Sequence, residues 1–76
     1  MERVLRVDFG VHVAKDSIGS MVTGLGAYGL VHQDHTDSRC YIVELVRPGK
    51  WAKLKRQLTQ WESYGFLRWR EISSTG

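Results

Sequence analysis

The chain repeats one pattern of strand, helix and helix stop at an interval of 36 residues. Residues 4–13 alternate apolar and polar side chains, which is the period of a half-buried strand, and a matching alternation recurs from residue 41 onward. After each alternation, apolar residues recur at the spacing of one helical face. Both helical stretches end in Tyr-Gly before a large apolar residue, at Tyr28-Gly29-Leu30 and Tyr64-Gly65-Phe66. Because glycine in this place ends a helix, the repeat predicts two βαβ units.

The pattern and its turn residues together define six elements. We expect strands over residues 4–13, 30–34, 39–46 and 66–72, a first helix from Asp16 or Ser17 to Tyr28, and a second helix from Pro48 to Tyr64. Two interleaved βαβ units give an α+β fold of ferredoxin-like type, the split βαβ sandwich (βαββαβ). Its four-stranded antiparallel sheet has the order 4-1-3-2 and carries both helices on one face. The predicted core contains Leu5, Val7, Val43, Leu54, Leu58 and Trp61, and residues 73–76 form a polar C-terminal tail.

The length of 76 residues limits the chain to a single domain, residues 1–76. Its composition, 42% hydrophobic and 25% charged, is typical of a folded globular chain. The one cysteine excludes an internal disulfide framework, and no CxxC or paired Cys/His spacing indicates a structural zinc, so no cofactor is expected. No continuous apolar run is long enough for a secretion signal or a membrane span, which favours a cytoplasmic protein.

Cysteine, histidine and aspartate side chains converge on the open face of the predicted sheet. The predicted topology places the end of the first strand beside the start of the third, so that His12, His32, Asp34 and Cys40 meet at one corner. A histidine near a thiol lowers the thiol pKa and activates it as a nucleophile, and the same group of ligands suits a transition metal. The competing interpretation is a solvated hairpin turn, since such turns collect histidine and aspartate.

The second helix carries a block of basic residues. Five of the 11 basic residues lie in a stretch that no acid interrupts, and they are Arg47, Lys50, Lys53, Lys55 and Arg56. Such a block attracts phosphate, so a nucleic-acid-binding module that uses this helix is one alternative. The other is the solvated back of an amphipathic helix. The sheet itself is not expected to bind RNA, because its strands lack exposed aromatic side chains for base stacking.

The first helix is free of charge over most of its length. No Asp, Glu, Lys or Arg occurs between Asp16 and Asp34, and the side opposite the apolar stripe presents Ser20, Thr23 and Ala27 among several glycines. Each interior glycine destabilises a helix by up to about 1 kcal/mol relative to alanine. A smooth, uncharged helix lets another backbone approach closely, and charge is depleted at the centres of protein interfaces. Alternatively, Gly19 and Gly24 allow close packing inside the domain itself.

These observations favour a non-enzymatic protein-binding module that acts by contact as an inhibitor or regulator. Its predicted contact residues are Ser20, Thr23, Gly24 and Ala27 on the first helix and Ile42 on the open face of the sheet. The chain lacks the phosphate-binding Gly/Arg loop of acylphosphatases and the CxxC of copper chaperones. In scale it resembles the accessory inhibitors that phages and plasmids encode, anti-CRISPR proteins among them. A homodimer is expected as well, because the second and fourth strands are sheet edges with unpaired backbone groups.

Overall fold

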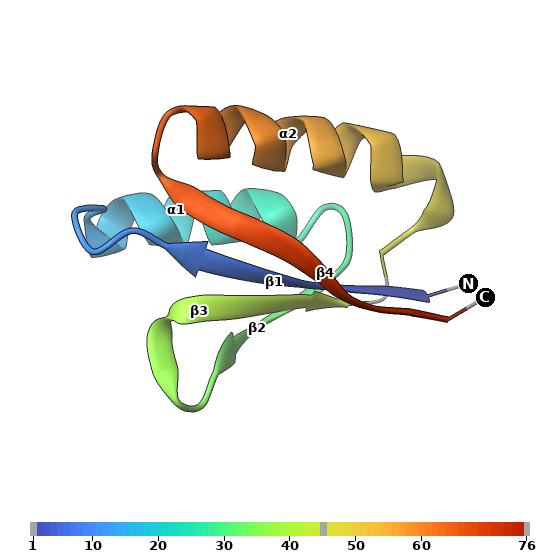
Figure 1. Ribbon diagram of the computed structural model, residues 1–76, viewed down its shortest axis with the longest axis horizontal. Coiled ribbons are helices and arrows are strands. Elements are labelled where there is room, and N and C mark those ends of the chain that lie inside the picture. The colour runs from blue at the N-terminus through green and yellow to red at the C-terminus, as the bar shows by residue number, and fades with distance from the viewer. Residues whose placement is uncertain (1, 45, 76) are drawn as a thin grey trace.

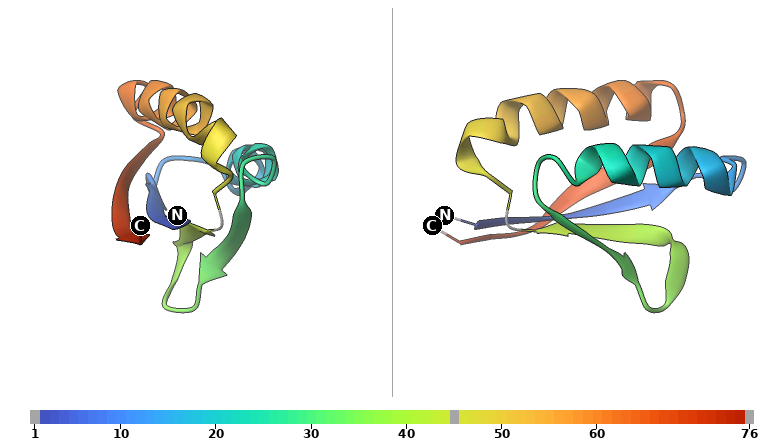
Figure 2. Two further views of the ribbon diagram at one scale, coloured as in Figure 1. Left: turned by 90° about the vertical axis from the view of Figure 1, so that its right-hand side faces the viewer. Right: turned by 180° about the vertical axis from the view of Figure 1, so that it is seen from behind.

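The computed structural model describes residues 2–44 and 46–75. In chain order the elements are β1 (Glu2–Phe9), α1 (Lys15–Leu25), β2 (Leu30–Asp34), β3 (Asp37–Glu44), a 3-10 turn (Pro48–Lys50), α2 (Trp51–Ser63) and β4 (Leu67–Thr75). The strands form one antiparallel sheet in the order β2-β3-β1-β4, and both helices cover the same face of it (Figure 1; Figure 2). The predicted ferredoxin-like α+β fold is confirmed.

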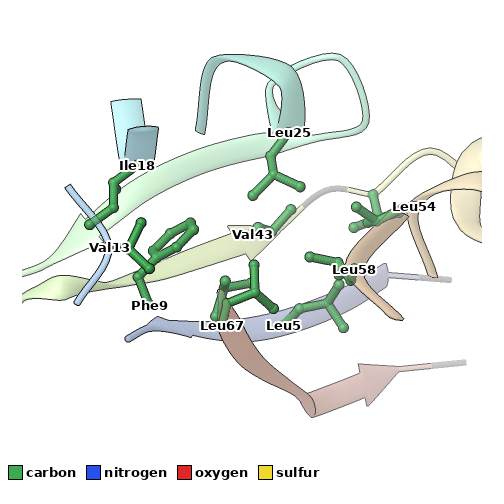
Figure 3. Packing of buried hydrophobic residues seen from close by; sticks show 11 residues of the cluster. Leu5, Phe9, Val13, Ile18, Leu25, Val43, Leu54, Leu58 and Leu67 are labelled. Carbon is green, nitrogen blue, oxygen red and sulfur yellow. The ribbon is translucent and has the colours of Figure 1, made fainter. Parts of the chain in front are cut away.

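The core lies between the sheet and the two helices. Figure 3 shows one cluster formed by Leu5 of β1, Val43 of β3, Leu25 of α1, and Leu54 and Leu58 of α2. All five are fully buried. Of the six predicted core residues, five are fully buried, and the sixth, Trp61, is partly buried against the same cluster. The burial pattern therefore follows the sequence periodicity, and only Leu45 of the predicted third strand lies outside the described residues.

The end of α2 has the hydrogen bonds of a Schellman motif. The backbone N–H of Phe66 donates to the carbonyl of Trp61 at 3.1 Å, and the N–H of Gly65 donates to the carbonyl of Glu62 at 3.0 Å. Gly65 has a φ of +80°, the left-handed conformation that costs glycine least. The predicted helix stop is confirmed here, and it turns Phe66 back toward Trp61.

In the corresponding Tyr28-Gly29 pair, glycine is required for a different reason. α1 has already ended at Leu25, so the prediction that the helix extends to Tyr28 is wrong. A Cβ placed on Gly29 would lie 2.6 Å from the backbone oxygen of Glu44 and 3.3 Å from the Cα of Val46. Glycine is required at this position because the start of β2 passes directly against the chain that leaves β3.

The first strand is shorter than the alternation of side chains predicts. β1 ends at Phe9, and the chain turns at Gly10, leaving the side chain of Val11 86% exposed. Val13 is buried, as expected from the alternation, but it reaches the core from the loop between β1 and α1. The prediction of a strand through residue 13 is therefore wrong, because a tight turn reproduces the alternation by chance.

Two further boundaries differ from the predictions. α1 begins at Lys15 after Ala14, which makes no side-chain cap, so neither Asp16 nor Ser17 is the N-cap. β4 continues to Thr75, and residues 73–75 pair with β1 where a free tail was predicted. Gly76 lies outside the described residues. Neither described helix is long and apolar enough to cross a membrane.

Arg39 fixes the loop between β1 and α1. Its Nη1 donates to the carbonyls of Gly10 and Val13, each at 2.8 Å. The partly buried guanidinium thus bonds two backbone carbonyls of the loop, of which that of Gly10 also accepts from the backbone N–H of Val13 at 3.0 Å. This contact holds the amino-terminal end of α1 in place over the sheet.

Candidate protein-binding surface

One side of α1 faces away from the domain. Ser20, Thr23 and Gly24 of α1 and Ala27 of the turn that follows it are all exposed there, whereas Ile18 and Leu25 are buried on the opposite side. We call the four exposed residues the α1 surface. Four of the five predicted contact residues therefore lie together, as helical periodicity requires.

The hydroxyl groups of the α1 surface bond to their own helix. Ser20 Oγ donates to the carbonyl of Asp16 at 3.2 Å, and Thr23 Oγ1 donates to the carbonyl of Gly19 at 2.9 Å. Their donors are satisfied without water or a partner. The surface is consequently neutral, and a partner that covers it leaves neither hydroxyl proton unbonded.

The glycines of α1 do not serve packing within the domain. Within residues 2–44 and 46–75, a Cβ placed on Gly19 or on Gly24 would have no atom within 4 Å outside the neighbouring helix backbone. The alternative that these glycines allow close packing of α1 on α2 or the sheet is wrong. Two residues of low helix propensity thus stand on an open surface with no contact in the domain that requires them.

We expect Gly24→Ala to raise the free energy of unfolding by about 0.5–1 kcal/mol. The added methyl group enters open space, and alanine restricts the unfolded chain more than glycine does. Urea denaturation of both proteins measures the difference. A loss of stability would mean that Gly24 makes a contact in the folded domain.

A groove of about 540 Å³ borders the α1 surface. It runs between the first half of α1 and the last half of α2, which lie side by side in opposite directions in Figure 2. Its walls include Ser17, Ser20 and Met21 of α1, Trp61 of α2, and Phe66. The α1 surface therefore continues into an apolar and aromatic depression, which is the composition of protein interface centres.

Exposed aromatic side chains stand at the edge of this groove. The side chain of Phe66 is 37% exposed, and its ring lies 5.6 Å from that of Tyr64 between centroids. Neither residue is among the predicted contact residues, because Phe66 was expected to begin a strand. The signal was present in the Tyr-Gly-Phe stop itself, since a Schellman motif brings the residue after glycine against the last helical turn.

Ile42 does not belong to the α1 surface. It lies on β3 opposite Arg6 of β1 and His32 of β2, on the sheet face that the helices leave uncovered. The structure therefore divides the predicted contact residues between two opposite faces of the domain.

The five predicted basic residues surround the first part of α2. Arg47, Lys53, Lys55 and Arg56 are exposed and Lys50 is partly so. Among the described side chains, none of the five lies within 4.0 Å of a carboxylate, whereas Arg3 and Arg6 form ion pairs. The backbone N–H of Arg47 donates to the carbonyl of Tyr28 at 3.1 Å, which places this basic group beside the exit of α1.

The predicted Cys/His/Asp corner does not form. His12 lies in the loop after β1 and lines the groove between the helices, and His32 approaches Glu44 at 3.8 Å. Cys40 and Asp34 do come together, but with Arg6 and Asp8 and no histidine. Within residues 2–44 and 46–75, no three Cys, His, Asp or Glu side chains are placed to hold a metal. The corner fails because β1 ends before residue 12.

Cys40 is buried beneath the side chains of Arg6, Asp8 and Asp34. Its side chain is fully buried although it points to the uncovered face of the sheet. Burial and the adjacent Asp8 raise the pKa of the Cys40 thiol from 9.0 to about 12. A thiol that stays protonated is a poor nucleophile, so the structure opposes a catalytic role for Cys40.

We expect native Cys40 to react with a disulfide reagent at neutral pH about a thousand times more slowly than Cys40 of the urea-unfolded chain. The reactive species is the thiolate, and the raised pKa lowers the thiolate fraction of the folded protein by about that factor. The absorbance of the released thiol follows both reactions. Equal rates would show that the thiol is accessible and ionised in the folded protein.

No protein-family model, curated protein or solved structure matches this chain significantly.

Proposed function

We propose that this protein is a non-enzymatic protein-binding module of the cytoplasm, which inhibits or regulates a partner protein by covering part of it. The observation that carries the proposal is the pair of glycines, Gly19 and Gly24, that stand in open space on an uncharged helix. Each weakens the domain, and no contact inside the domain compensates. A second protein whose backbone approaches the helix closely is the compensation that we infer.

The neighbouring groove supplies what a flat helix lacks. Phe66 and Trp61 offer aromatic surface in a depression, where buried contacts contribute most to affinity. The α1 surface beside these two rings has no charged side chain, so a partner that covers it excludes water without burying an unpaired charge. The small size of the domain also suits an accessory inhibitor, whose whole action is to occupy a surface.

We expect Thr23→Arg to abolish binding of the partner while it leaves the melting temperature nearly unchanged. Thr23 is exposed, so the larger side chain fits the free domain but not a covered one. The measurement is recovery of the partner with tagged protein from the cells that encode it, after nuclease treatment. Thr59→Arg is the matched control, because Thr59 is exposed on α2 away from the groove wall. Loss of the partner with both variants, or with neither, contradicts the proposal.

The basic residues around α2 support nucleic acid as a second candidate partner. No described carboxylate lies within 4.0 Å of these five side chains, so no ion pair offsets the positive charge that attracts phosphate. If this candidate is correct, replacing Lys50, Lys53 and Arg56 by Gln abolishes oligonucleotide binding, and each lost phosphate contact lowers the salt slope on duplex DNA by about 0.9. Thr23→Arg then remains active. The two candidates thus predict opposite responses of the two variants.

A further inference from the structure

The sheet face that the helices leave uncovered has an ordered distribution of charge. Residues directly opposite each other in an antiparallel sheet point to the same side, so the strand register defines the members of this face. They are Val4, Arg6 and Asp8 on β1, Leu30, His32 and Asp34 on β2, Cys40, Ile42 and Glu44 on β3, and Arg68 and Arg70 on β4. We call these residues the open face. Its three arginines and three carboxylates balance in formal charge.

The charges are separated across the open face. β4, at one edge, carries Arg68 and Arg70. The other half of the face, β2 and β3, carries Asp34 and Glu44. The sheet order therefore gives the open face a basic edge and an acidic half.

The arginines of the basic edge form no ion pair among the described side chains, although Arg68 lies opposite Asp8 of β1. Arg70 lies opposite Arg6, a pairing of like charges that destabilises a sheet. Arg6 turns away to Asp8 at 3.3 Å and Asp34 at 3.7 Å. Among the described side chains, neither Arg68 nor Arg70 has a carboxylate within 4.0 Å. The acidic half lies up to three strand spacings away, roughly 14 Å, which is too far for an ion pair.

We propose that two copies of this chain pack open face to open face. A two-fold axis parallel to the strands, between the two sheets, places β4 of one copy over β2 of the other. Arg68 and Arg70 then face the acidic half of the second copy, and each copy does the same for its mate. A surface whose two halves carry opposite charge is complementary to itself under this operation, which an isologous dimer requires.

The open face also carries apolar side chains. Ile42 lies between Arg6 of β1 and His32 of β2, Val4 lies near the start of β1, and Leu30, which is 51% exposed, lies at the start of β2. The face measures about 20 Å on each side, so it buries less than the ~800 Å² that each partner contributes to a standard interface. We therefore expect a weak dimer that dissociates in the micromolar range and is further weakened by salt. Both α1 surfaces remain uncovered, because the helices lie on the outer side of each sheet (Figure 2).

The test is sedimentation velocity on the purified chain at about 100 μM and ~50 mM salt, where a weak dimer forms. We expect twice the mass of 8.7 kDa. Arg68→Glu/Arg70→Glu makes the basic edge acidic, and His32→Lys/Glu44→Lys makes the acidic half basic. We expect each variant alone to dimerise at least about tenfold more weakly than the wild type, because like charges then face each other.

Mixing the two variants in equal amounts is the decisive experiment, because it tests whether opposite charges on the two open faces hold the dimer together. Acidic edge then meets basic half in the mixed pair, so a heterodimer forms with affinity near that of the wild type. Lys55→Glu/Arg56→Glu makes the same change in net charge on α2, away from the open face, and leaves the dimer intact. Circular dichroism verifies folding, and single Arg70→Glu replaces the double variant if that one does not fold. A monomeric wild type, dimers unaffected by the open-face variants, no heterodimer on mixing, or equal disruption by the α2 control overturns the proposal.

Discussion

Leu58→Ala is expected to lower the free energy of unfolding by about 2–5 kcal/mol. Leu58 is fully buried between α2 and the sheet, where it meets Leu5 and Leu54 (Figure 3). Truncation removes apolar contacts and leaves a cavity that helices anchored at both ends fill poorly. A domain of this size has a total stability of about 5 kcal/mol, so the variant is expected to be largely unfolded at elevated temperature.

Urea denaturation of Leu58→Ala measures this loss directly. Thr59→Ala, one residue further on the exposed side of α2, is the matched control and is expected to change stability by no more than about 0.5 kcal/mol. A loss below about 1 kcal/mol for Leu58→Ala would mean that the leucine is not in the core.

Gly29→Ala is expected to destabilise the domain by about 1–3 kcal/mol. The new methyl carbon would lie 2.6 Å from the backbone oxygen of Glu44, so β2 and the chain that leaves β3 must move apart. No flexible side chain absorbs the clash, because both contacting segments are backbone. Thermal unfolding of Gly29→Ala beside Gly24→Ala tests the cause, since the same substitution has opposite expected signs at the two sites. Equal effects would attribute both to glycine composition alone.

The order of strands and helices can be predicted from the sequence, because burial of one face of each element sets the spacing of its apolar residues. Alternation on strands and three-to-four spacing on helices identify the core face of each element, and five of the six predicted core residues are fully buried. Boundaries are weaker, because a turn at Gly10 buries Val13 without a strand. The two Tyr-Gly pairs look alike in the sequence but have different structural causes. Gly65 is required for its positive φ, and Gly29 is required because the backbone of Glu44 and Val46 passes close to it.

The candidate site likewise has one part that the sequence predicts and one part that it does not. The uncharged side of α1 was predicted, because helical periodicity alone brings Ser20, Thr23 and Gly24 together. The groove beside it was not, since it is formed by side chains from α1, α2 and the loop after β1 together with Phe66, which follows the Schellman turn. The predicted corner of cysteine, histidine and aspartate failed because β1 ends at Phe9, so His12 lies in the following loop and not beside Cys40.

If a partner protein packs closely on α1, Gly24→Ala weakens its binding without damage to the fold. One variant is measured twice, for stability by urea denaturation and for affinity toward the partner recovered with the wild type. The account predicts that stability rises by about 0.5–1 kcal/mol while affinity falls about tenfold, because the methyl group intrudes between two closely packed surfaces. Damage to the fold cannot explain that combination. A variant that gains stability and keeps the affinity of the wild type would contradict the claim.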